Sequence, residues 1–254
     1  MIPYRDENRT VRRPVVTWLL IAANVLVWLV VQGGGTAPAL PASICNLGLT
    51  AGEITGLVPP GTRVPIGEGL ACVTEAGRPF LHVLTSMFLH GSWLHLIGNT
   101  WFLYLFGNNV EDSMGRRRFL AFYLLSGIAA ATLQVLLDPA AAVPMVGASG
   151  AISGVMGGYL VLYPTVRVHT LVPLGFFFFT VKLPAWTMLL YWLALQVLGG
   201  FTAIARAESG GVAFGAHVGG FITGAILVKL FVRPEYVAQH RAKTYQLSDY
   251  RRAA

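Results

Sequence analysis

The sequence predicts an all-α, polytopic membrane protein, a bundle of six spanning helices with one long external loop between helices 1 and 2. Two observations carry this prediction. Of the 254 residues, 55% are hydrophobic and only 11% are charged, whereas a soluble domain carries about 25% charged residues. The apolar residues also form several continuous runs, and about 20 such residues cross a bilayer as a helix.

Six apolar runs define the expected spans. We place them at residues 15–31, 92–109, 119–137, 148–163, 185–205 and 211–231, and the second could begin earlier, in the run 80–89. The stretch 170–181 is also apolar, but Pro173 and Gly175 interrupt it and Lys182 and Pro184 follow it. We expect an interfacial loop packed on the bundle there, because a seventh span would reverse the orientation of the last helix.

The basic residues predict the orientation. All but three of the 18 Lys and Arg residues fall in the N-terminal tail, in the loops after the second and fourth spans, and at the C-terminal end from Lys229 onward; the exceptions are Arg63, Arg78 and Arg206. Positive loops favour the cytoplasm. We therefore expect cytoplasmic tails at 1–14 and 233–254, a membrane domain at 15–232 with an external loop at about 32–79, and a prokaryotic plasma membrane as the location. The charges flank apolar runs instead of forming a basic stripe with aromatics, which excludes nucleic acid as a partner.

Polar groups inside spans are costly and mark functional sites. Ser149 and His217 lie in the outer third of the fourth and sixth spans. Small residues recur every four positions beside them, at Gly150, Gly154 and Gly158 and at Ala216, Gly220 and Gly224. Such faces let two helices approach closely, so the Ser149 hydroxyl is expected within reach of the His217 imidazole. That pair is a nucleophile and its general base.

A second group predicts stabilisation of an oxyanion. His95 and Asn99 lie four residues apart on one face of the second span, and the backbone N–H of Ser149 precedes the hydrogen-bond ladder of its own helix. No Asp or Glu lies near enough to complete a triad, so we expect a Ser/His dyad. Ser153 and His90 are expected to be structural, and Glu111 is expected to pack and cap.

Four motifs, which follow one another along the chain as they do in the family, resemble the rhomboid family of intramembrane serine proteases across about residues 15–232. They are Gly147-Ala148-Ser149-Gly150, Ala216-His217-Val218-Gly219-Gly220, His90-Gly91-Ser92-Trp93-Leu94-His95 followed by Asn99, and Gly107, Glu111 and Gly115 spaced four apart. The chain departs from the family at Ser153, where an aromatic residue is frequent, and at Leu81-His82, where a Trp-Arg pair is frequent.

The resemblance implies a serine endopeptidase that cleaves transmembrane or membrane-adjacent segments of membrane proteins in the lipid bilayer, with no metal or cofactor. It also implies that substrate arrives between the second and fifth spans, where Trp186, Tyr191 and Trp192 are expected to face lipid, and that water arrives under the loop at 206–210. The oligomeric state stays open.

Other classes fit less well. A zinc intramembrane protease needs H-E-x-x-H, an aspartyl intramembrane protease needs two acids within spans, and a soluble hydrolase of the G-x-S-x-G type needs glycine where Ala151 stands. A transporter would need ligand-binding groups near mid-membrane. The main alternative is a catalytically inactive rhomboid-like protein that binds membrane proteins.

The two cysteines, Cys45 and Cys72, both fall in the long external loop. A pair on the outer side of a membrane is expected to be bonded if that compartment is oxidising. The alternative is two buried, unpaired thiols that serve as apolar fillers.

Overall fold

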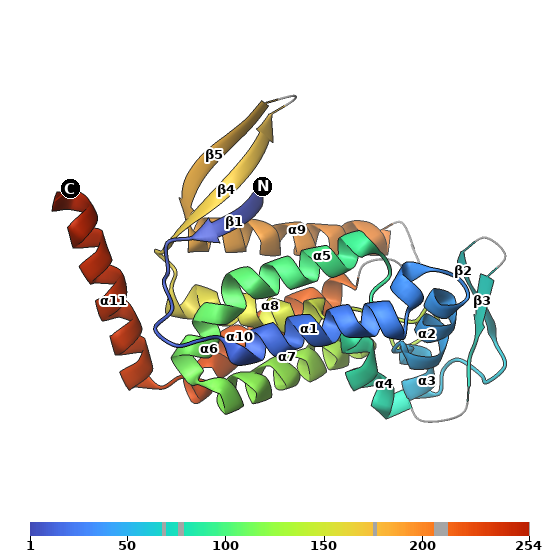
Figure 1. Ribbon diagram of the computed structural model, residues 1–254. Helices are drawn as coiled ribbons and strands as arrows, with labels where there is room; N and C mark the ends of the chain where they lie inside the picture. Colours follow the sequence, from blue (N-terminus) through green and yellow to red (C-terminus); the bar gives the residue numbers. More distant parts are fainter. Residues whose placement is uncertain (68–69, 76–78, 175–176, 206–212, 254) are drawn as a thin grey trace.

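The computed structural model describes residues 1–67, 70–75, 79–174, 177–205 and 213–253 of the protein. The water path expected under the loop at 206–210 therefore lies outside the described residues. The described part is mainly helical, and its long helices lie side by side (Figure 1): α1 (Val15–Val30), α7 (Arg116–Leu137), α8 (Ser149–Leu162), α9 (Ala185–Ala205) and α10 (Phe214–Phe231).

The second predicted span is broken. It comprises α4 (Pro79–Thr85) and the 3₁₀ turn η2 (Ser86–Phe88), followed by α5 (Trp93–Phe102), the π turn η3 (Leu103–Gly107) and α6 (Asn108–Met114). The helical stretches on either side of the break meet at 88°. The Oγ of Ser92 accepts a hydrogen bond from the backbone N–H of His95 at 3.1 Å, which caps the start of α5.

Length and composition qualify several helices as membrane spans. Among the described residues, α7, α9 and α10 each qualify, and the bent pair adds a fourth if it forms one span. The helices α1 and α8 are apolar but shorter, with 16 and 14 residues. These helices are those of a helical membrane protein.

Helix α8 lies at the centre of the bundle and packs against α7 and α10. A Cβ atom built on Gly224 would stand 1.9 Å from the carbonyl oxygen of Gly154, and one built on Gly220 would stand 2.0 Å from that of Gly150. Only glycine fits at such a distance, so the predicted small-residue contact between these two helices is confirmed.

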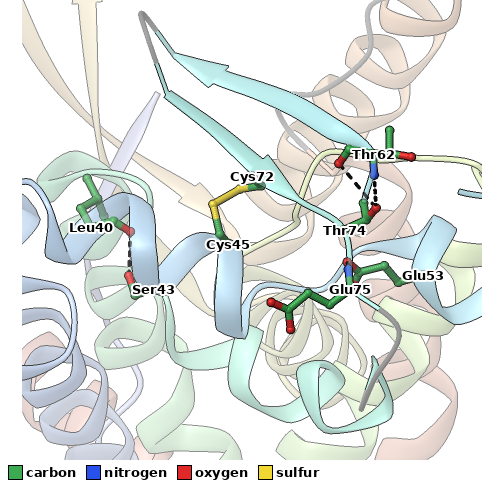
Figure 2. Close-up of a disulfide and its surroundings, with 8 residues drawn as sticks. All are labelled: Leu40, Ser43, Cys45, Glu53, Thr62, Cys72, Thr74 and Glu75. Carbon is green, nitrogen blue, oxygen red and sulfur yellow. Dashed lines mark hydrogen bonds between the residues drawn. A yellow bond between two sulfur atoms is a disulfide. The ribbon is translucent and has the colours of Figure 1, made fainter. Parts of the chain in front are cut away.

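A compact cap covers one end of the bundle (right in Figure 1). It follows the 3₁₀ turn η1 (Gly33–Gly35) and contains α2 (Ala39–Leu47), α3 (Ala51–Thr55), β2 (Arg63–Gly67) and β3 (Leu70–Val73). The segment expected to be a loop is therefore folded. Figure 2 shows the disulfide between Cys45 on α2 and Cys72 on β3, which confirms the predicted pairing. Leu49 and Met145 form an antiparallel bridge that connects the cap to the segment before α8.

The opposite end of the bundle carries a three-stranded antiparallel sheet in the order β1 (Ile2–Asp6), β4 (Arg167–Leu174), β5 (Phe177–Pro184). The expectation of an interfacial loop at 170–181 is wrong, because this stretch forms a hairpin that pairs with the N-terminal strand. The helix α11 (Pro234–Ala253) follows α10 at the same end. Both tails thus contain regular structure.

Candidate active site

Ser149 and His217 meet across the α8–α10 contact. The Oγ of Ser149 and the Nε2 of His217 lie 2.7 Å apart, within hydrogen-bond distance. Ser149 is the first residue of α8 and His217 lies one turn into α10. The close approach of the two helices at their glycines brings the hydroxyl and the imidazole together, as the sequence predicts. A hydroxyl that donates to an imidazole nitrogen has the geometry of a nucleophile with its base.

The other imidazole nitrogen of His217 has a partner that the sequence reasoning missed. Its Nδ1 lies 2.7 Å from the Oε1 of Gln196 on α9. If Nε2 accepts from Ser149, Nδ1 carries the proton and donates it to the amide oxygen of Gln196. This bond selects the tautomer in which Nε2 is free to act as a base.

The ring of Trp192, one turn before Gln196, lies 5.9 Å from the His217 ring between centroids and stacks on Phe221. Trp192 is partly buried because its side chain packs against α10, so it is less open to lipid than the sequence suggests. An aromatic residue from α9 thus stands beside the base where Ser153 supplies none. Trp186 and Tyr191 are 48% and 41% exposed, as expected of a lipid-facing surface.

His95 lies beside the hydroxyl from the α5 side. Its Nδ1 accepts a hydrogen bond from the backbone N–H of Gly91 at 3.3 Å, so a neutral ring carries its proton on Nε2. A Cβ atom at Gly147 would stand 2.8 Å from that Nε2 and 3.4 Å from the Oγ of Ser149, and the φ of Gly147 is +133°. Glycine at 147 therefore lets the His95 donor approach the hydroxyl.

Two more donors converge on the same place. The Nδ2 of Asn99 is buried and has no hydrogen-bond partner within the part of the chain that the structure describes. The backbone N–H of Ser149 has no intrahelical acceptor, because α8 begins at that residue. An unsatisfied buried donor such as the Asn99 amide costs free energy, so its presence beside the Ser149 N–H fits a site that accepts a negative oxygen during a reaction.

A cavity of about 540 Å³ contains all of these groups, including Ser149, His217, His95, Asn99 and Gln196. It is large enough for several amino-acid side chains of a substrate segment. Among the described residues, no group of three or more His, Cys, Asp or Glu side chains is placed to hold a metal ion.

The residues expected to be structural have structural partners. The Oγ of Ser153 donates to the carbonyl oxygen of Ser149 at 2.6 Å. His90 is buried, and its backbone N–H and C=O both bond to the Gln32 side chain at 2.8 Å. The Glu111 carboxylate accepts from the backbone N–H groups of Val16 and Thr17, so it caps the start of α1.

Gln196 was detectable in the sequence as the one strongly polar side chain within the span 185–205. Its importance was not, because apolar helices also carry amides that only join helices. Trp192 could not be distinguished in the sequence from the other aromatic residues of the same helix, so its contact with His217 was not predictable.

Comparisons with known proteins agree with the motifs. A family model described as "Rhomboid domain" matches residues 78–234. "RHOMBOID-like protein 5" of Arabidopsis thaliana is 30% identical over 155 residues, which are 61% of this chain and 45% of that protein. "Rhomboid protease GluP" of Bacillus subtilis is 27% identical over 212 residues, 84% of this chain and 34% of that protein.

"Rhomboid protein 1, mitochondrial" of Saccharomyces cerevisiae is 27% identical over 150 residues, 58% of this chain and 40% of that protein. The chain thus spans less than half the length of each of these relatives. Since the family model covers more than half of the chain, the protein belongs to the rhomboid family.

Proposed function

We propose that the protein is an intramembrane serine endopeptidase that cleaves transmembrane or membrane-adjacent segments of other membrane proteins with a Ser149/His217 dyad. The observation that carries this proposal is the 2.7 Å contact between the Ser149 Oγ and the His217 Nε2 within a cavity that holds unsatisfied donors. The protease named among the relatives supports the reaction class.

The proposed reaction is acyl transfer. His217 accepts the proton of the Ser149 hydroxyl as its oxygen attacks the carbonyl carbon of the substrate peptide bond. The oxygen of the tetrahedral intermediate accepts hydrogen bonds from the His95 Nε2–H, the Asn99 Nδ2–H and the Ser149 backbone N–H. His217 then protonates the leaving amine, and water hydrolyses the acyl-enzyme. One such oxyanion donor typically lowers the barrier by about 2.7–4 kcal/mol.

The proposed topology has six spans, namely α1, the α5–α6 segment, α7, α8, α9 and α10. Both tails are cytoplasmic, and the disulfide-bonded cap at 32–79 is external. The positive-charge bias and the position of the cap opposite the sheet and α11 support this arrangement. The proposed divisions are then a cytoplasmic tail at 1–14, the membrane domain at 15–232 and a second cytoplasmic tail at 233–254. The relatives come from a bacterium, a plant and yeast. The proposed location, the plasma membrane of a prokaryote, is one of several membranes consistent with these relatives.

Substrate is proposed to reach the cavity sideways from the lipid, between α5 and α9. The cavity is lined by Leu94 and Phe102 of α5 and by Trp192 and Gln196 of α9. Both helices therefore line the cavity, and on this path substrate side chains meet the dyad between them.

A catalytically inactive rhomboid-like protein that binds membrane proteins is the alternative. Such proteins typically lack the serine or the histidine, and this chain keeps both in hydrogen-bond contact. Binding without cleavage gives no reason for an oriented His217 tautomer, or for a buried Asn99 donor that has no partner among the described residues.

Three variants test the proposal on a single-pass reporter protein in detergent or liposomes. Ser149→Ala and His217→Ala are each expected to abolish cleavage while the protein stays monodisperse and melts near the wild-type temperature. Ser153→Ala is the matched control, one turn away on the same helix, and should retain cleavage. Loss of activity in Ser153→Ala with activity kept in Ser149→Ala would overturn the assignment of the nucleophile.

A further inference from the structure

Arginines from three separate segments converge at the end of the bundle that carries α11. Two of them, Arg12 and Arg13, precede α1. Three more begin α7, namely Arg116, Arg117 and Arg118, and Arg233 lies between α10 and α11. All six line one cavity of about 340 Å³, together with Glu111, Asp112, Gly115 and Tyr236. Inner loops need only be basic to orient the chain, so a shared cavity requires another explanation.

The two acids in this cavity are already satisfied. Glu111 accepts three hydrogen bonds from the start of α1. Asp112 accepts from the backbone N–H groups of Val11 and Arg12, lies 3.2 Å from the Arg12 guanidinium and lies 2.7 Å from the Nδ1 of the buried His240. These carboxylates therefore have little capacity left to neutralise the other arginines.

Most of those arginines lack an anion. Arg13, Arg116 and Arg117 have no side-chain hydrogen bond or ion pair within the described ranges. The Nε of Arg233 is buried and has no partner there either, although its Nη1 donates to the Tyr236 hydroxyl at 3.2 Å. A buried guanidinium N–H without an acceptor is unfavourable, so the cavity has unmet capacity for negative oxygen atoms.

The backbone adds donors of the same kind. The helix α7 has 22 residues and begins at Arg116, and its first ladder bond is accepted by Gly115 from Phe119. The N–H groups of residues 116–118 therefore have no intrahelical acceptor. Guanidinium groups beside free amides at a helix start suit a phosphate, because its several oxygens can accept bidentate bonds from arginine and further bonds from the amides.

We propose that this arginine-lined cavity between the N-terminal tail, the start of α7 and the α10–α11 junction binds a phosphate group. The phosphate can belong to the headgroup of an anionic lipid or to a free phosphate compound. In either case it joins three segments that lie far apart in the sequence, and both tails of the chain are among them.

The three unpaired arginines provide the test. The triple variant Arg13→Gln, Arg116→Gln, Arg117→Gln removes exposed positive charges that line the cavity. The control triple Arg5→Gln, Arg9→Gln, Arg167→Gln removes the same charge from equally exposed positions outside it. Both are purified in a non-ionic detergent and titrated with phosphatidylglycerol, with phosphatidylcholine, and with pyrophosphate. Bound ligand is counted by native mass spectrometry, and the melting temperature is followed in parallel.

The wild type and the control triple are expected to bind phosphatidylglycerol more tightly than phosphatidylcholine, and the cavity triple to bind it at least about tenfold more weakly. Binding of pyrophosphate that depends on the cavity, with no preference between the two lipids, assigns the site to free phosphate compounds. Equal binding by both triples, or no binding of either probe by the wild type, overturns the proposal.

A measurement on the unaltered chain guards against misfolding of the triple variant. Phenylglyoxal modifies accessible arginines, and the bound phosphate should protect Arg13, Arg116 and Arg117 while leaving Arg5, Arg9 and Arg167 reactive. Equal protection of both sets contradicts a site in the cavity. Neither readout needs proteolysis, so an inactive protein would still answer the question.

Discussion

The base of the proposed dyad is held by a neutral amide. His217 donates from Nδ1 to the Gln196 oxygen at 2.7 Å, where many serine hydrolases use a carboxylate. An amide fixes the tautomer and the ring orientation but adds no negative charge beside the imidazolium that forms during catalysis. In a membrane this has an advantage, because a buried carboxylate would itself be costly to ionise.

Replacing Gln196 with Leu should therefore lower kcat and leave KM nearly unchanged. The buried Nδ1–H would lose its acceptor, which typically costs about 1–3 kcal/mol and corresponds to about 5- to 150-fold in rate. Gln196→Glu restores an acceptor and should recover part of the activity. Kinetics on the reporter, with circular dichroism to verify folding, test this; a Gln196→Leu variant with the kcat of the wild type would mean that Gln196 does not position the base.

Asp6 is a second residue whose environment has consequences. Its carboxylate accepts from the Tyr159 hydroxyl at 2.7 Å and from the Asn109 amide at 2.8 Å. Burial raises the pKa of Asp6 from 3.8 to about 7, and the hydrogen bond from Tyr159 opposes the rise. Because the pKa is higher in the folded protein, the folded state favours the protonated Asp6 carboxyl. Its contribution to stability is full below pH 3.8 and is lost as the pH rises through about 7.

The docking of β1 should accordingly weaken between pH 5.5 and pH 8.5. Amide hydrogen exchange of residues 2–6, corrected for the intrinsic rate at each pH, measures this. Histidines change charge in the same range, so Asp6→Asn isolates the carboxylate and should show a smaller pH dependence. An identical dependence in the wild type and in Asp6→Asn would exclude Asp6 as its source.

At the scale of elements, the α8–α10 contact sets the distance within the dyad. Gly220 lies about one helical turn after His217, and Gly150 directly follows Ser149. A Cβ atom on Gly220 would stand 2.0 Å from the carbonyl oxygen of Gly150. A methyl group at this position must push the two helices apart. The geometry of the proposed dyad therefore depends on residues that take no part in the proposed chemistry.

We predict that Gly220→Ala destabilises the protein by about 1–3 kcal/mol and lowers kcat strongly, even though alanine is the better helix former. Gly98→Ala on α5 is the matched control for stability alone: its built Cβ meets no atom within 4 Å beyond its own helix backbone and chain neighbours, but it lines the active-site cavity. Thermal unfolding in detergent compares the two. A Gly220→Ala variant as stable and active as the wild type would show that the helices have room to spare.

The elements that the sequence located best are those with purely local signals. Helices α1 and α9 begin where their apolar runs begin, because roughly twenty apolar residues must form a helix in lipid. The β1–β4–β5 sheet was not predictable in the same way. Its pairing joins residues 2–6 to residues 168–171. A partner so distant in the sequence leaves no local signal, and the alternation that buries Val168 and Thr170 is seen only in the structure.

At the scale of the whole molecule, the two ends of the bundle are built differently. One end carries the cap that is bonded by Cys45 and Cys72, and the other carries the sheet, α11 and the arginine-lined cavity. The dyad lies between α5, α8, α9 and α10, toward the cap. The sequence predicted Ser149, His217, His95 and Asn99 from their depth in the spans. It could not predict Gln196 and Trp192, because their roles depend on how α9 is rotated against α10.

The most direct test of the central claim is digestion of a single-pass reporter by the purified protein in liposomes, together with a serine-directed phosphonate. The account predicts cleavage within or next to the transmembrane segment of the reporter, inhibition by the phosphonate, and a covalent adduct that mass spectrometry locates at Ser149. Reporter bound but intact, with no adduct at Ser149, would contradict the account and favour a protein that binds membrane proteins without cutting them.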